Sequence, residues 1–393
     1  MDFSIYGNFS TATGHHYVHG PQARTNAVAR LNYDALGFIL RGKKMSRVLR
    51  GGDTLKGEVY LKQKGAGEWI GLETETTPEI HTTGTFYSVP WSMHRVVDAW
   101  DERAMRQNMN GNAGADGGFQ QFSDMVYARK QNLEMQKINL IDDALWAVPD
   151  KSKMETSGSA RKEPLSIPAL VNEFSNGLYP AEAPGGVWTT IQQIATTEEG
   201  FSNFVPYRGT YDNRTVNSPT NMIAALDLAY EKLNFKPPPA NGQYFEKESG
   251  MLPAQKWMAA SPEGVVALKQ LCRASQDRWG NESDAYGRRP TYAGVPIVTV
   301  PQLTSKALYP TGTAGALSTE LVTTNSVGGW RYYIIDSESI DWVWSSDWYD
   351  HMDGPISQQN NPSRKAIFYE TQCGSFCNNR RLNGMIYPSA NIA

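Results

Sequence analysis

Hydrophobic residues recur with helical spacing in several segments of the chain. The longest is 119–147, where the apolar positions that fall near one face are Phe119, Phe122, Val126, Leu133, Ile141 and Leu145. Pro149 would end this helix, which at 1.5 Å per residue would be a rod of roughly 40 Å. The same spacing predicts helices over 220–235 and 262–273, and shorter ones over 93–110 and 166–174.

Strand patterns divide into an early pair and a later group. Residues 55–62 alternate between apolar and polar positions, and 82–91 read as a returning strand, so 51–92 is predicted to be a long two-stranded ribbon. An isolated ribbon is marginal in water, and this one needs support from its own subunit or from an adjacent one. Later strands are predicted over 256–260, 295–300, 330–335, 340–344, 366–371 and 374–378. The mixture predicts an α+β fold.

Charge is distributed unevenly along the chain. Residues 1–35 are rich in Gly, Asn, Ser, Thr and His and are predicted to form an extended arm. Residues 1–50 carry seven Lys or Arg against two Asp, or +5, whereas residues 336–353 carry six acids and no Lys or Arg, or −6. A basic amino-terminal segment can face nucleic acid, an acidic neighbour or plain solvent, and the charge alone leaves these alternatives open.

The composition predicts a globular chain. Of the 393 residues, 40% are hydrophobic and 11% aromatic, which suffices for a sizeable core. Charged residues make up only 20%, which suits a surface covered by neighbouring subunits and equally an aromatic-rich enzyme. Three cysteines favour a reducing compartment, and neither a signal-peptide pattern nor an apolar run of the ~20 residues that cross a bilayer is present. We therefore expect synthesis in the cytoplasm and no membrane partner.

Motifs for catalysis or cofactor binding are missing from the sequence. GxSxG, GxxxxGK[ST], HExxH and GxGxxG do not occur. His15 and His19 have metal-ligand spacing but no helical context, and Cys373 and Cys377 lack a second pair for zinc. We expect no catalytic residue, no cofactor and no metal site.

One acidic and aromatic cluster supports an alternative function. It comprises Asp341, Trp342, Trp344, Asp347, Trp348, Asp350, His351 and Asp353. Paired carboxylates among tryptophans are what glycoside cleavage uses. A carbohydrate-active enzyme or sugar-binding protein built on 340–353 is thus the alternative, and a strand followed by an acidic loop is the plainer interpretation.

The order of these segments resembles the major capsid protein family of tailed bacteriophages, the Hong Kong 97-type fold. The local text that is similar to the family is RGGDTL at 50–55, YAGVPIVTVPQL at 292–303 and IFYETQCGSFCNNRRLNGMI at 367–386. The resemblance implies an N-terminal arm at 1–50 and an extended β-hairpin loop at 51–92. A peripheral domain at 93–189 with the long spine helix 119–147, a mixed axial domain at 190–335 and a β-rich return to the peripheral domain at 336–393 would follow.

The resemblance also implies partners. Copies of the chain would assemble as hexamers and pentamers into an icosahedral virion capsid around non-specifically bound, packaged DNA, together with scaffolding, portal and decoration proteins. The extended-loop residues expected between subunits are Leu55, Lys56, Val59, Leu61, Lys62, Lys64, Trp69, Phe86 and Tyr87. The basic residues of the arm expected to face DNA or another subunit are Arg24, Arg30, Arg41, Lys43, Lys44, Arg47 and Arg50.

Overall fold

The computed structural model divides the chain into two compact units. It describes residues 47–49, 52, 54–59, 61, 84–103, 129, 132–133, 135–147, 149, 151–154, 163–171, 190–211, 221–233, 256–275, 291–292, 295–303, 331–336, 339–346, 351–358 and 361–388. Of these, unit 1 contains the residues that fall within 93–142 and 347–372, and unit 2 contains those within 32–92, 143–346 and 373–393.

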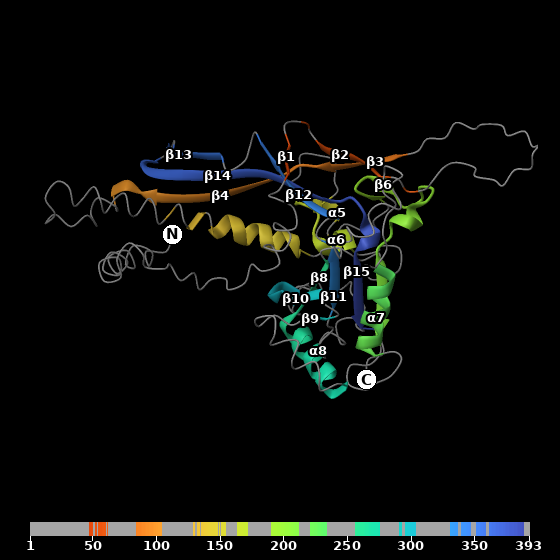
Figure 1. Cartoon of the computed structure of the whole chain (residues 1–393). Helices are drawn as coiled ribbons and strands as arrows, with labels where there is room; N and C mark the ends of the chain where they lie inside the picture. The colour runs from red at the N-terminus through yellow and green to blue at the C-terminus, as the bar shows by residue number, and fades with distance from the viewer. Residues whose placement is uncertain are drawn as a thin grey trace, which may run out of the picture. The chain divides into compact units, whose positions relative to one another are not determined.

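A six-stranded sheet forms the centre of unit 2 (Figure 1). Its strands are, in spatial order, β7 (Tyr207–Tyr211), β15 (Gly384–Pro388), β11 (Tyr332–Asp336), β8 (Lys256–Ala260), β10 (Val295–Thr299) and β9 (Thr291–Tyr292). Every residue of β8 and β11 is buried. These two strands therefore lie in the core, as apolar strands that are covered on both faces do.

Helices α7 (Met222–Leu233) and α8 (Pro262–Ser275) pack on this sheet. Their apolar faces share one core with the strands, which includes Met222, Leu226, Leu233, Leu268, Ile334 and Ile386. Asn221 Oδ1 accepts a hydrogen bond from Ala224 N at 2.7 Å and begins α7, and Lys256 Nζ donates to the carbonyl of Leu233 at its end. The predicted elements α7, α8, β8, β10 and β11 are confirmed.

Unit 2 also contains several short elements, three of which are joined through Arg380. The short elements are α5 (Lys151–Met154), α6 (Ile167–Val171), β5 (Thr190–Ile191), β6 (Ile194–Ala195), η1 (Phe201–Phe204), η3 (Pro301–Leu303) and η4 (Arg380–Leu382). The side chain of Arg380 is buried, donates from Nε to the Leu170 carbonyl at 2.7 Å and lies 5.5 Å from the ring centroid of Phe204. It therefore satisfies the last turn of α6 while it anchors η4.

Strand β14 (Asn361–Cys377) contributes residues to both units. Its carboxyl-terminal part pairs antiparallel with β12 (Ile340–Ser345), which pairs parallel with β1 (Arg47–Leu49). The prediction of two strands, 366–371 and 374–378, is wrong, because one strand runs through both. Gly374 lies within this strand, and a Cβ there would lie 2.5 Å from Leu55 Cδ1. This glycine makes room for a neighbouring side chain within a continuous strand.

In unit 1, β14 pairs antiparallel with β13 (His351–Gln358), and β4 (Ser92–Asp101) also pairs with β14. The prediction of a helix over 93–110 is wrong for residues 93–101, which lie in β4, whereas residues 102 and 103 are helical. The buried positions Ser92, Val96 and Trp100 are four apart, which is close to one helical turn but also equals two strand repeats. The polar residues between them hid the strand alternation.

A helix covers one face of this unit 1 sheet. Residues 129, 132–133 and 135–145 are helical and fall within the predicted spine helix; residues 119–128 lie outside the described residues. Leu133 packs with Val96, Trp100, Ile367 and Tyr369 in a buried cluster. The packing explains why the apolar stripe of the helix is interrupted: Lys137 Nζ donates to Tyr369 Oη at 3.1 Å, so a polar position also faces the sheet.

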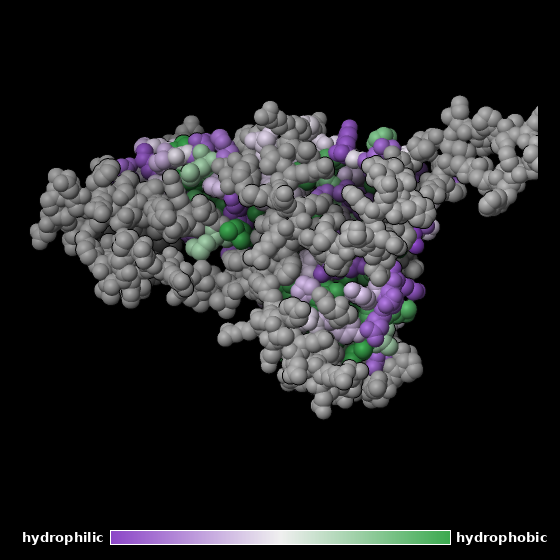
Figure 2. All heavy atoms as spheres, viewed as in Figure 1, coloured by the Kyte–Doolittle hydropathy of each residue, from purple (hydrophilic) through white to green (hydrophobic). Residues whose placement is uncertain are grey.

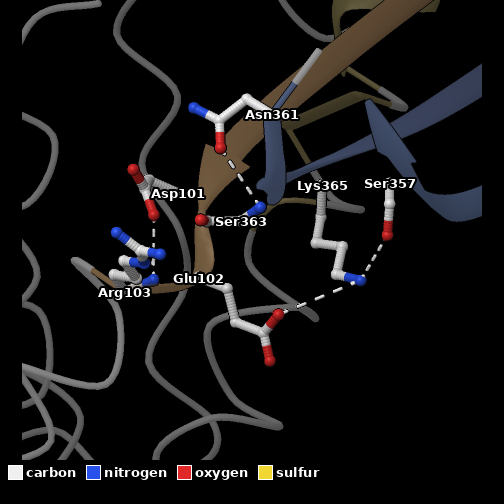
Figure 3. A network of polar contacts seen from close by, with 7 residues as sticks. All are labelled: Asp101, Glu102, Arg103, Ser357, Asn361, Ser363 and Lys365. Carbon is white, nitrogen blue, oxygen red and sulfur yellow. Dashed lines mark hydrogen bonds and ion pairs between the residues drawn. The ribbon is translucent and has the colours of Figure 1, made fainter. Parts of the chain in front are cut away.

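Polar contacts hold the end of the unit 1 sheet (Figure 3). Lys365 Nζ donates to Ser357 Oγ at 2.6 Å and lies 3.9 Å from Glu102 Oε2. Asn361 Oδ1 accepts from Ser363 N at 3.2 Å at the beginning of β14. These contacts join the ends of β4, β13 and β14.

Candidate assembly surfaces

The predicted ribbon is present in unit 2 as strands β2 (Thr54–Val59) and β3 (Thr85–Pro90). They are antiparallel, with Leu55 opposite Val89 and Val59 opposite Thr85. Because paired residues share a face, Leu55, Val59 and Val89 lie on one side of the ribbon. The ribbon thus has an inner face that is buried and an outer face that is exposed.

The inner face anchors the ribbon on its own unit. The ring of Tyr87 lies over Gly57, where a Cβ would come within 2.2 Å of the phenol oxygen. Tyr87 Oη donates to Asn378 Oδ1 at 3.0 Å, and its ring centroid lies 5.1 Å from that of Phe376. The glycine at position 57 therefore admits the aromatic side chain that fastens the ribbon.

The outer face carries Lys56, Glu58 and Phe86. Phe86 is opposite Glu58 in the register and is 71% exposed, more than any other large hydrophobic residue among those described. Desolvating an exposed phenyl ring is favourable, so this face offers a single strong apolar contact to another molecule.

The residues predicted to lie between subunits fall into three groups. Leu55, Val59, Leu61 and Tyr87 are buried within unit 2, and the Leu61 carbonyl accepts from Asn203 Nδ2 at 3.0 Å. These four support the ribbon from its own unit, which is one of the two alternatives that the sequence left open. Lys56 and Phe86 are exposed, and their contact with a neighbour stays a prediction. The predicted positions outside the described residues are Lys62, Lys64, Trp69, Arg24, Arg30, Arg41, Lys43, Lys44 and Arg50; Arg47 lies in β1.

Unit 1 leaves the second face of its sheet open. Met93 and Val97 on β4 are 45% and 46% exposed, and Ile356 on β13 is 43% exposed. Arg95, between the two β4 residues, forms an ion pair through Nε with Glu370 Oε1 and lies 5.8 Å from the centroid of Phe368. On the same unit, a hollow of about 350 Å³ is lined by Arg95, His351, Asp353, Ile356, Phe368 and Glu370. No sequence pattern pointed to this surface, because its residues come from three strands.

Strand β13 offers side chains to a partner more readily than backbone. It lies at the end of the strand order, and residues 351–357 are all exposed. Its register with β14 shifts between Asp353 and Ile356, where Gly354 has a φ of 121° and Pro355 has no N–H to donate. Such a bulge prevents regular edge-to-edge pairing with another strand.

The acidic and aromatic cluster is divided in its described part, where His351 and Asp353 are exposed on β13 and line the hollow of unit 1. Asp341, Trp342 and Trp344 are buried in β12, and Asp341 Oδ2 accepts from Asn378 Nδ2 at 2.7 Å. A carboxylate that is covered and held in this way cannot reach a glycan, so the alternative of a carbohydrate-active protein is not favoured. Asp347, Trp348 and Asp350 lie outside the described residues.

Other reactive side chains are also enclosed. Burial raises the pKa of the Cys373 and Cys377 thiols to about 12, and the two cysteines are not joined to each other.

Within the described ranges no group of three His, Cys, Asp or Glu is placed to hold a metal ion. No described helix is both long and apolar enough to span a membrane.

Comparison with known proteins identifies the fold. No family model and no curated protein sequence matches the chain. Among solved structures, the chain is similar to one described as "Cyanophage A-1(L) capsid asymmetric unit", at 10% identity and a TM-score of 0.51, over 94% of this chain and 98% of that one. It is also similar to the "Capsid of native GTA particle" (12% identity, TM-score 0.49, 96% and 97% covered) and to that of "Mycobacterium phage Bobi" (10%, 0.47, 96% and 98%). The cyanophage match shows an α+β phage capsid fold, as the sequence predicted.

Proposed function

We propose that this chain is the major capsid protein of a tailed bacteriophage, a shell subunit without catalytic activity. The observation that carries the proposal is the match to a phage capsid chain over nearly the full length of both chains. A subunit of this kind has to present several surfaces to copies of itself. The exposed outer face of the ribbon and the open sheet face of unit 1 are two such surfaces.

The proposal gives each surface a physical role. The ribbon is held at its base by Tyr87, so its outer face keeps a fixed orientation and loses little entropy when a neighbour binds. Phe86 would lose its water contact against an adjacent subunit. The open face of unit 1, with Met93 and Val97, would be covered in the same way.

The finer parts of the proposal concern the particle. Copies of the chain assemble as hexamers and pentamers into an icosahedral head that encloses double-stranded DNA. The basic arm within residues 1–50 faces that DNA or a neighbouring subunit through salt-sensitive contacts that do not depend on base sequence. Scaffolding, portal and decoration proteins are the further partners. Their contacts lie on the completed shell or its precursor.

Electron microscopy and native mass spectrometry of the purified chain test the proposal. We expect rings of five and six subunits or closed shells for the natural sequence. The variant Phe86→Ser should assemble poorly, while its free energy of unfolding changes by less than about 0.5 kcal/mol because the ring is exposed.

The matched control is Phe86→Tyr, which keeps the ring and should assemble normally. A natural chain that remains a monomer under all assembly conditions would contradict the proposed function. If Phe86→Ser and the natural chain assemble equally well, the outer ribbon face is not an assembly surface. The proposed function would not be contradicted by that result.

A further inference from the structure

A basic hollow in unit 2 has a composition that the shell function alone does not explain. It has a volume of about 570 Å³ and is lined by Ser202, Val205, Pro206, Tyr207, Arg208, Lys232, Arg381 and Tyr387. Among the lining residues that the structure describes there are three cations and no carboxylate, which is a formal charge of +3 for this part of the lining. The lining residues come from η1, β7, α7, η4 and β15 and the residues between them. Because they are far apart in the sequence, no sequence motif predicts the hollow.

Two of the three cations of the hollow, Arg208 and Lys232, lie beside aromatic rings. Arg208 donates from Nη2 to Tyr387 Oη at 2.9 Å, and its guanidinium lies 5.3 Å from the centroid of the Tyr387 ring. Lys232 Nζ lies 5.4 Å from the centroid of Tyr207. A tyrosine phenol is protonated at neutral pH and can donate a hydrogen bond, and burial raises the pKa of Tyr207 further. Fixed cations beside phenol donors form a site that recognises carboxylates.

The size of the hollow favours protein side chains over a DNA duplex. Its volume falls within the roughly 300–1,000 Å³ that compact ligands occupy. A duplex instead carries a phosphate for about every 1.7 Å of its axis and needs an extended basic surface. A short acidic segment of a protein can place two or three carboxylates in one hollow.

The chain itself contains a segment with the complementary charge. Residues 347–353 include Asp347, Asp350 and Asp353 and no Lys or Arg, or −3. Asp353 is exposed on β13, whose bulge leaves side chains as its means of contact. The two charges, +3 and −3, are equal and opposite, which favours an attraction between copies of one chain.

We infer that the basic hollow of one subunit binds the acidic segment 347–353 of a second copy. This inference rests on the proposed function and names one contact by which it operates. The contact is electrostatic, so it steers subunits into register and weakens as salt rises. Arg208, held by Tyr387, positions the site, and Lys232 and Arg381, whose positions are exposed, meet the incoming carboxylates.

Disulfide trapping between two separate preparations tests the contact directly. One preparation carries Lys232→Cys and the other Asp353→Cys, both with Cys272→Ser, and the two are mixed under mild oxidation. The buried thiols of Cys373 and Cys377 should not interfere, since their pKa values are raised to about 12. We expect a covalent dimer that contains one chain of each kind. A link that forms only when both substitutions are in one chain, or no link at all, would overturn the inference.

Charge reversal supplies an independent test. Lys232→Glu should lower the yield of assembled particles by about tenfold at low salt, because like charges then face each other. Mixing it with Asp353→Lys should restore assembly. The matched control Lys269→Glu reverses a charge on α8, outside the hollow, and should assemble like the natural chain.

Assembly of the natural chain, measured beside these variants, distinguishes the proposed function from the inferred contact. If it fails to assemble, the proposed function fails and the inference falls with it. If it assembles, yet Lys232→Glu is indistinguishable from Lys269→Glu, the inference alone is wrong.

Discussion

The two parts of strand β14 lie in contrasting environments. Residues 361–365 are exposed or half-buried, and Phe368, farther along in unit 1, still has an open side. Residues 373–377, in unit 2, are all buried. In Figure 2, hydrophobic residues on the visible face lie partly uncovered over the part of unit 1 that contains β4 and β13. One strand thus contributes to a buried core in unit 2 and to a partly exposed surface in unit 1, where a partner could bind.

This difference indicates which of the two units contributes more to the stability of the free subunit. In unit 2 the chain closes its own core, through two helices on a six-stranded sheet. In the described part of unit 1 one helix covers one face of the sheet, and apolar side chains on the other face are exposed to water. We conclude that unit 2 sets the stability of the free subunit, and that unit 1 gains most from assembly.

Two phenylalanines on β14 give the largest test of this contrast. Phe376→Ala should lower the free energy of unfolding by about 3–5 kcal/mol, because Phe376 is buried and packs on Tyr87. The matched Phe368→Ala should cost only about 1 kcal/mol, since that ring is half-exposed beneath Arg95. Urea unfolding monitored by circular dichroism measures both. Equal losses would show that the two halves are packed alike.

The next largest effect concerns the ion pair inside unit 1. Arg129 Nη1 lies 2.8 Å from both carboxylate oxygens of Asp98, and its guanidinium lies 5.4 Å from the centroid of Trp100. Both side chains are largely buried, so Arg129→Ala should destabilise unit 1 by about 2–3 kcal/mol after allowance for the exposed part of Asp98.

Hydrogen exchange followed by mass spectrometry should locate that loss. We expect faster exchange in β4 and in the helical residues 135–145, with α7 and α8 unchanged. The control Arg129→Lys keeps the charge but not the planar guanidinium. Its exchange rates in unit 1 should therefore fall between those of the natural chain and those of Arg129→Ala. Uniform acceleration across the chain would contradict the separation of the two units.

The ribbon base should respond more weakly. A Cβ at Gly57 would displace the Tyr87 ring from Asn378 and Phe376, so Gly57→Ala should cost about 1–3 kcal/mol. The control Tyr87→Phe removes only the hydrogen bond and should cost about 1 kcal/mol. Thermal unfolding measures both variants. A neutral Gly57→Ala would mean that the ribbon is not fastened by this contact.

The smallest effect at neutral pH concerns the two thiols on the buried half of β14. Burial raises the pKa of Cys373 and Cys377 from 9.0 to about 12, so the folded chain keeps protons that the unfolded chain releases. Their contribution to stability is complete below pH 9 and declines as the pH rises from 9 towards 12. At pH 8 a thiol reagent should label both positions only after unfolding. Rapid labelling of the native chain would show that this half of β14 is open.

The sequence predicted the elements whose apolar spacing fits only one kind of structure. Helices α7 and α8 have long stripes with clear ends, and the ribbon has alternation on both sides of a turn. Strand β4 was mistaken for a helix because its buried positions Val96 and Trp100 are four apart. The candidate assembly surfaces were harder to predict from the sequence, because they depend on which side chains are exposed and on which distant strands pair. Phe86 was identified from its place in the ribbon, whereas the burial of Leu55 and Tyr87 depends on contacts with residues 374–378.

Sedimentation velocity of the purified natural chain, repeated over a range of protein and salt concentrations, tests the central claim most directly. The proposed shell subunit should sediment as rings or shells many times heavier than the 43.7 kDa chain, and these should shrink back to small species as salt weakens the charged contacts. A single 43.7 kDa species at every concentration would contradict the account.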